Sequence, residues 1–206
     1  MSLTYGFYNS VNNDRVYDAE QVSSIFDGLI SDGVYSSIGD KLMVSTNNGM
    51  VVKIGSGRAW FKHTWSYNDS DYNIEIDPAD PLLDRIDAVI LEVDHSIGSR
   101  ANSFKVIKGE NATNPARPLL TNNANIGQYA LAYIYISANQ TEISEANITN
   151  VIGTTETPFV KGIVDNNIDD TVRQELDKKQ NRVTYSVEDL VDGTSPLTTN
   201  NIYVVY

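Results

Sequence analysis

Four aromatic side chains that follow one another closely in the sequence are best suited to binding chemistry. Trp60, Trp65, Tyr67 and Tyr72 all lie within the segment 60–72. Exposed rings of this kind stack on the faces of pyranose sugars, and neighbouring Asn and Asp side chains would bind the hydroxyl groups. Aromatic residues on strands, however, usually bury large apolar areas. Two interpretations therefore stay open: a glycan-stacking surface, or a strand that needs bulky core residues.

The spacing within "GRAWFKHTW" (57–65) predicts a single strand that follows a Gly55-Ser56-Gly57 turn. Residues five positions apart lie on opposite faces of a regular strand, so at most one of the two tryptophans is expected to face the core. His63 alternates with Phe61 and Trp65 and is expected to share their face. We favour the interpretation of this stretch as a core strand.

Catalytic chemistry has little support in this sequence. The serines, His63 and His95 occur without a G-x-S-x-G motif or an ordered triad signature. The chain has no cysteine, which excludes thiolate catalysis and Cys-type zinc sites. We predict that the protein is not an enzyme and has no catalytic residue, cofactor or metal. Glycosidase-like carboxylate pairs stay open, because such partners meet only in space.

A run of acidic residues in "DPADPLLDRID" is the remaining candidate for metal binding. The residues concerned are Asp77, Asp80, Asp84 and Asp87. The D-x-[DN]-x-[DN]-G pattern of a calcium loop is missing, and two prolines restrict the backbone. We interpret these aspartates as turn-forming and strand-flanking residues, with Arg85 as a local partner for Asp84 or Asp87.

Charge and hydropathy exclude several classes of partner. The formal net charge is −12, from 27 acidic and 15 basic residues, without a basic cluster. Nucleic acid and anionic membranes are therefore not expected as partners.

The N-terminus lacks the basic-then-apolar order of a signal peptide. No apolar run approaches the ~18 residues of a membrane span. We expect synthesis in the cytoplasm and export, if any, by lysis or within an assembly.

Hydropathy patterns predict a mainly β chain. Val22, Ile25, Phe26, Leu29 and Ile30 follow helical spacing, which predicts a helix from Asp18 to Ile30 with Asp18 as its cap. Strands and hairpin turns are expected from residue 42 onward. They include "YNIEI", "SFKVIKG", "QYALAYIYIS" and "RIDAVILEVD", the last buried on both faces. The proline-containing stretches "DPADPLLD" and "GENATNPARP" are expected to be loops.

The C-terminal part has a different pattern. Its apolar residues are spaced four apart, which predicts a helix with a short buried stripe. They are Val160, Val164, Ile168, Val172 and Leu176. A terminal hairpin is expected to follow. The predicted fold is an antiparallel β-sandwich-like domain at 34–157, an N-terminal helical segment at 1–33, and a C-terminal helix plus short hairpin at 158–206.

Several short motifs follow one another in a specific order. They are Gly57-Arg58-Ala59, Arg85-Ile86-Asp87, Lys108-Gly109 before the Asn114-Pro115 loop, and Leu131-Ala132. Their order resembles a β-rich module of tail and baseplate proteins from bacteriophages and prophages of Gram-positive hosts, and the resemblance covers about residues 20–160. The ending "DLVDGTSPLTTNNIYVVY" also looks like the C-terminus of such tail proteins.

This resemblance implies a structural role in a phage tail, baseplate or related injection device. It implies location in the virion and protein–protein contacts with other tail or baseplate proteins. Similar tail appendages are commonly trimeric, so a homo-oligomer, with a trimer favoured, is expected. The alternative is a carbohydrate-binding receptor-recognition module that contacts a host surface glycan. A cell-wall glycan hydrolase is the third and least favoured class.

Overall fold

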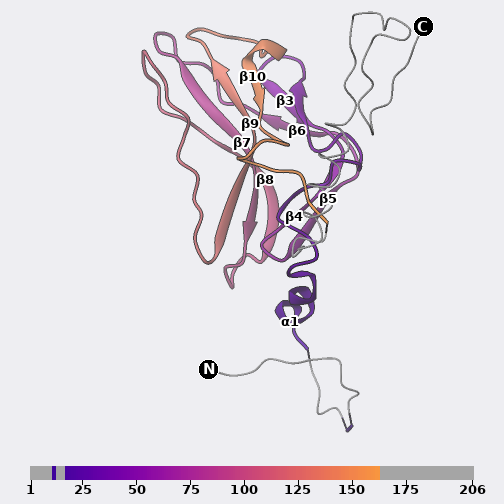
Figure 1. Cartoon of the computed structure of the whole chain (residues 1–206). Helices are drawn as coiled ribbons and strands as arrows, with labels where there is room; N and C mark the ends of the chain where they lie inside the picture. Colours follow the sequence, from indigo (N-terminus) through magenta and orange to yellow (C-terminus); the bar gives the residue numbers. More distant parts are fainter. Residues whose placement is uncertain (1–10, 13–16, 163–206) are drawn as a thin grey trace, which may run out of the picture. The chain divides into compact units, whose positions relative to one another are not determined.

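The computed structural model describes residues 11–12 and 17–162 (Figure 1). Its helical elements are α1 (Ala19–Ser23), η1 (Ser24–Phe26) and η2 (Glu145–Asn147). Its strands are β1 (Gly33–Val34), β2 (Val44–Thr46), β3 (Val51–Ile54), β4 (Gly57–Phe61), β5 (Thr64–Asn68), β6 (Tyr72–Glu75), β7 (Arg85–Asp94), β8 (Ala101–Ile107), β9 (Ile126–Ile136) and β10 (Ile148–Asn150). The prediction of a mainly β chain is confirmed for these residues.

The described strands form three antiparallel sheets. Their strand orders are β1-β4-β5, β2-β3-β6 and β10-β9-β7-β8. The long β7 lies inside the four-stranded sheet, between β8 and β9, where it is buried almost throughout. This confirms the prediction that "RIDAVILEVD" is a strand buried on both faces. The two proline-containing stretches lie outside the named strands, as predicted.

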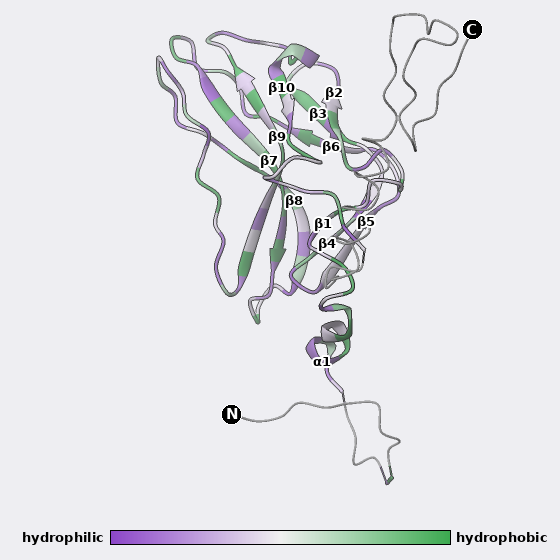
Figure 2. Ribbon diagram, viewed as in Figure 1, coloured by the Kyte–Doolittle hydropathy of each residue, from purple (hydrophilic) through white to green (hydrophobic). Residues whose placement is uncertain are grey.

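One main core joins the three sheets. It contains Val34 and Phe61 from the β1-β4-β5 sheet, Val52 from the β2-β3-β6 sheet, and Leu91 and Ile134 from the four-stranded sheet. Figure 2 shows hydrophobic and hydrophilic residues alternating along strands, as expected for strands with one face in a core. A second, smaller cluster covers the opposite face of the four-stranded sheet around Ile90 and Tyr133.

The predicted N-terminal helix is largely wrong. Asp18 is the N-cap, in a capping box with Gln21, but the α-helix ends at Ser23 and only a 3₁₀ turn follows. The apolar side chains that suggested the long helix do not enter the core. These residues, here called the apolar row, are Val22, Ile25, Phe26 and Leu29, each 41–47% exposed. Helical spacing predicted a buried stripe, but these four side chains stay more than 40% exposed, although Phe26 contacts Trp60 of β4.

The stretch "GRAWFKHTW" is a hairpin rather than a single strand, so the prediction of one strand is wrong. Lys62 and His63 both have positive φ, +47° and +62°, and form the turn between β4 and β5. Two consecutive positive φ values fit a type I′ turn, whose twist matches that of the flanking strands. His63 therefore lies in the turn and does not share a face with Phe61 and Trp65.

A buried ion pair connects two segments that the sequence motifs had singled out. Arg85 and Asp87 are 1% and 0% exposed, and Arg85 Nε donates to both carboxylate oxygens of Asp87 at 2.9 and 3.1 Å. The backbone N–H of Gly109 donates to Asp87 at 2.9 Å. A Cβ on Gly109 would lie only 2.1 Å from the carbonyl oxygen of Ile86. Glycine at 109 therefore permits the close approach that this hydrogen bond needs.

Chain contacts divide the protein into two units, Met1–Val164 and Asp165–Tyr206. The first unit includes residues 158–162, which run beside 30–34 through Val34 N to Pro158 O and Ser31 N to Lys161 O hydrogen bonds. Most of the predicted C-terminal stripe and the terminal hairpin lie outside the described residues. They stay predictions from the sequence.

Candidate functional site

The β4–β5 hairpin places four side chains on one face of its sheet. Trp60 pairs with Trp65 and Arg58 pairs with Tyr67 across the two strands, so these four side chains point the same way. This hairpin aromatic face consists of Arg58, Trp60, Trp65 and Tyr67. The other face carries Ala59 and Phe61 into the core, where Phe61 stacks on Tyr129 with ring centroids 3.8 Å apart.

The two tryptophans have opposite environments. Trp60 is 9% exposed and meets Phe26 edge-on, with ring centroids 5.4 Å apart. Trp65 is 65% exposed, and Tyr67 is 55% exposed. The expectation that they lie on opposite faces of one strand is wrong, because they are cross-strand partners. Trp60 lies on the central strand of the β1-β4-β5 sheet and contacts Phe26, whereas Trp65 lies on the edge strand β5.

Arg58 organises the exposed part of this face. Its guanidinium carbon lies 4.9 Å from the ring centroid of Tyr67 and 5.8 Å from that of Trp65. Such cation–π contacts contribute about 0.5–1 kcal/mol at exposed sites and so favour the observed ring orientations. Among the described residues, Arg58 Nε is buried without a hydrogen-bond partner. The two rings therefore contact a guanidinium whose Nε makes no hydrogen bond with the described part of the chain.

An open cleft of about 320 Å³ adjoins Trp65. This Trp65 cleft is lined by Thr64, Trp65, Val93, Asp94, His95, Arg100, Ala101 and Asn102. The residues come from the start of β5, the end of β7 and the segment that opens β8. Pairing of β7 with β8 brings Asp94 opposite Ala101, which places both sides of the cleft together.

Hydrogen bonds fix the polar side chains of the Trp65 cleft. Asn102 Nδ2 donates to Thr64 Oγ1 at 2.9 Å and to Ser66 Oγ at 2.8 Å, which ties β8 to β5. His95 Nε2 donates to the carbonyl oxygen of Lys62 at 3.1 Å. The Asp94 carboxylate accepts from the Ser96 N–H at 2.8 Å. Hydrogen bonds from Ser96 hold the pKa of Asp94 below its usual value, so this carboxylate is ionised at neutral pH.

Tyr72 does not belong to this site. It lies on β6 in a different sheet, where it pairs with Ile54 and contacts Phe104 of β8 with ring centroids 5.3 Å apart. Of the four aromatic residues with predicted stacking potential, the structure brings together Trp60, Trp65 and Tyr67. Only Trp65 and Tyr67 offer exposed rings on the hairpin aromatic face.

The aspartates of the acidic run 77–87 make structural contacts with other parts of the chain. Asp77 binds Lys108 at 2.9 Å, and Asp80 accepts from the Leu82 and Leu83 N–H groups. Asp84 accepts from the Tyr135 hydroxyl and the Ala138 N–H. Asp80 forms a turn and Asp84 flanks β7, as predicted, whereas Asp87 lies inside β7. Of the two partners predicted for Arg85, the structure shows Asp87. Across residues 11–12 and 17–162, no cluster of three or more potential metal ligands is present.

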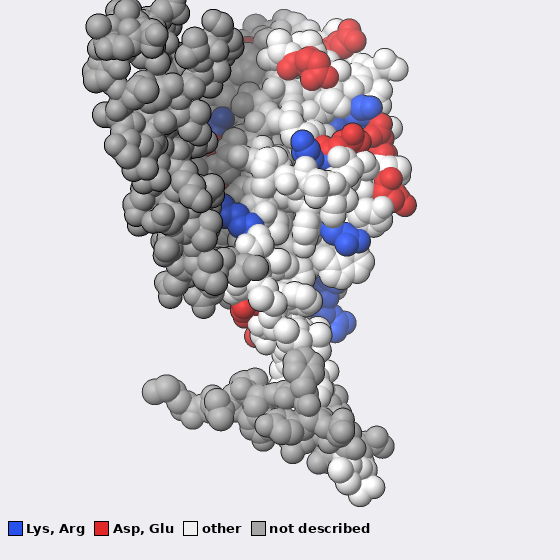
Figure 3. Space-filling view, turned by 45° about the vertical axis from the view of Figure 1, so that its right-hand side comes forward, with Lys and Arg blue, Asp and Glu red and all other residues white. Residues whose placement is uncertain are grey.

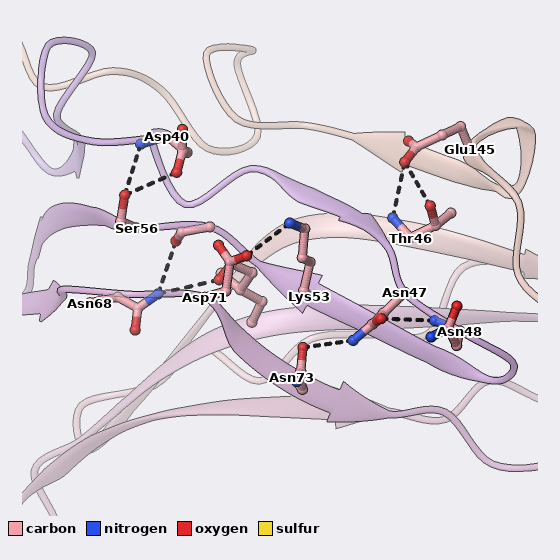
Figure 4. Close-up of polar contacts among 12 residues, drawn as sticks. Asp40, Thr46, Asn47, Asn48, Lys53, Ser56, Asn68, Asp71, Asn73 and Glu145 are labelled. Carbon is pink, nitrogen blue, oxygen red and sulfur yellow. Dashed lines mark hydrogen bonds and ion pairs between the residues drawn. The ribbon is translucent and has the colours of Figure 1, made fainter.

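Polar side chains on the β2-β3-β6 sheet and its adjoining loops bind one another (Figure 4). Lys53 Nζ lies 2.8 Å from Asp71, Asn47 Nδ2 donates to Asn73 at 3.0 Å, and Glu145 accepts from both the backbone and the hydroxyl of Thr46. These contacts tie loops to strand ends. Figure 3 shows basic and acidic side chains interspersed over a largely uncharged face.

Sequence reasoning missed the polar half of the Trp65 cleft. Asp94, Arg100 and Asn102 carried no motif, and His95 stood out only as one of two histidines. The pairing of β7 with β8 could have predicted the cleft, because a hairpin brings together the residues on both sides of its turn.

Comparisons with protein families, curated proteins and solved structures find no match to this chain. In the part of the chain that the structure describes, no helix is long and apolar enough to cross a bilayer.

Proposed function

We propose that this protein is a non-enzymatic structural component of a phage tail, baseplate or related injection device. Its motif order resembles that of such modules, and the contacts of the motif residues suit a structural role. The buried carboxylate of Asp87 accepts hydrogen bonds from Arg85 and from the backbone of Gly109. Leu131 lies at the register shift between β7 and β9. The core between the four-stranded sheet and the smaller sheets supports a β-sandwich-like description.

The apolar row is the observation that carries this proposal. Val22, Ile25, Phe26 and Leu29 are large apolar side chains in one short segment, and each is more than 40% exposed. Contiguous exposed apolar surface marks interaction sites, because burying it against a partner is favourable. Phe26 also contacts the buried ring of Trp60, so the apolar row is anchored to the β1-β4-β5 sheet. A protein that works through protein–protein contacts needs a surface of this kind.

The partners proposed for this surface are further copies of the chain and other tail or baseplate proteins. The resemblance to trimeric tail appendages favours a trimer. Location in the virion follows from the same proposal. The net charge of −12 opposes nonspecific self-association, so apolar contacts have to supply the attraction.

Light scattering of the full chain tests this assembly role. We expect a trimer at micromolar concentration, and we expect the double variant Ile25→Asp/Leu29→Asp to be monomeric, because it places two charges in the apolar row. Both side chains are more than 40% exposed, so the fold should persist, as circular dichroism would verify. The control Leu119→Asp alters a side chain that is 96% exposed and lies outside the row. A monomeric wild-type chain would contradict the proposed homo-oligomer.

A further inference from the structure

We propose that the Trp65 cleft binds a neutral oligosaccharide, with one sugar ring stacked on the indole of Trp65. This inference is independent of the assembly role, because it concerns different residues from the apolar row. It rests on the exposure of Trp65, the adjoining cleft and the polar side chains that line it.

The indole of Trp65 is exposed to solvent beside the cleft and is available for stacking. Its side chain is 65% exposed, which leaves a large apolar surface in water. Arg58 approaches the ring from the β4 side, whereas the cleft lies on the other side of β5, towards β8. Arg58 contacts the indole but does not line the cleft, so this contact leaves the cleft open. A pyranose ring has an apolar C–H face that matches such a platform, and a preset ring orientation lowers the entropy cost of binding.

The cleft offers both acceptors and donors for sugar hydroxyls. Asp94 is an ionised acceptor, and one of its oxygens is fixed by the Ser96 N–H. Asn102 uses Nδ2 to bind Thr64 and Ser66, which leaves its carbonyl oxygen as an acceptor. Arg100 is exposed at the rim, and its guanidinium has no ion-pair partner among the residues described. Hydroxyl groups donate and accept, so a sugar satisfies all three kinds of group.

Charge assigns the ligand to the neutral class. The cleft has one carboxylate, Asp94, and one guanidinium, Arg100, so it has no excess of positive charge for a phosphate or uronate. The chain as a whole carries a net charge of −12, which repels polyanions. A volume of about 320 Å³ is at the small end of ligand sites, which fits one or two sugar rings of a longer chain.

The test is binding of the labelled full chain to an array of neutral hexose and N-acetylhexosamine oligosaccharides, with teichoic acid as the anionic arm. Hits are then titrated by calorimetry. We expect Trp65→Ala to weaken binding by about tenfold or more, which corresponds to about 1.4 kcal/mol. Asp94→Asn should weaken binding several-fold, because asparagine keeps the acceptor for Ser96 but loses the charge. Trp65→Phe should retain part of the affinity.

Leu119→Ala is the matched control, because it shortens an exposed apolar side chain outside the cleft and should leave binding unchanged. Three results would overturn the proposal. They are no binding to any neutral glycan on the array, binding to teichoic acid alone, and equal affinity of the wild-type and Trp65→Ala chains.

Discussion

Replacing Asp87 with alanine is expected to lower the free energy of unfolding by about 3–5 kcal/mol. The substitution leaves the guanidinium of Arg85 buried at 1% exposure without its counter-charge. It also removes the acceptor of the Gly109 N–H. Arg85 donates in addition to the carbonyl oxygens of Pro78 and Asp77, so loss of the carboxylate is expected to loosen the whole 77–84 connection. Urea unfolding followed by circular dichroism measures the change.

The control for this variant is Lys108→Ala. Lys108 pairs with Asp77 in the same region of the fold, but both side chains are about half exposed, 51% and 64%. Solvent screens such a pair, so its removal should change stability little. If both variants lower the free energy of unfolding equally, the buried Arg85–Asp87 pair stabilises the fold no more than an exposed pair does, which would contradict this prediction.

The two tryptophans should respond very differently to truncation. Trp60→Ala is expected to lower the free energy of unfolding by about 3–5 kcal/mol, because the side chain is 9% exposed and packs against Phe26. Trp65→Ala should change it by no more than about 0.5 kcal/mol, because that side chain is 65% exposed. Thermal unfolding of both variants checks the contrast.

These two variants form a matched pair, since they remove the same side chain from directly opposed positions of one hairpin. A large loss of stability for Trp65→Ala would show that its ring is structural, and it would weaken the case for a ligand platform. A small loss for Trp60→Ala would show that the contact with Phe26 contributes little.

Strands with strong patterns were predictable from sequence. The apolar run after Arg85 is a buried strand, and its charged first end contains the Arg85–Asp87 pair. The hairpin at Lys62 and His63 was not predicted, because neither residue is the glycine or asparagine that usually occupies positive φ. That one turn decides whether Trp60 and Trp65 share a face. An error at a single turn thus changed the interpretation of the site.

The helix and the cleft show a different limit. Helical spacing predicted burial of Val22, Ile25 and Leu29, but spacing states only which side chains share a face and not what covers that face. The Trp65 cleft is assembled from positions 64–65, 93–95 and 100–102. Strand pairing places these segments together, and no local pattern encodes their proximity. Trp65 was therefore predictable as a candidate from its residue type, whereas the face on which it lies and the polar residues beside it were not.

The central claim, that the protein is a structural component of a phage tail or baseplate, is tested most directly by mass spectrometry of purified particles. Particles released after prophage induction of the encoding strain would be banded on a density gradient and digested with trypsin. The account predicts that peptides from this chain co-migrate with the particles in a constant ratio to the other tail proteins. Abundant chain in the lysate but none in the particle fraction would contradict it.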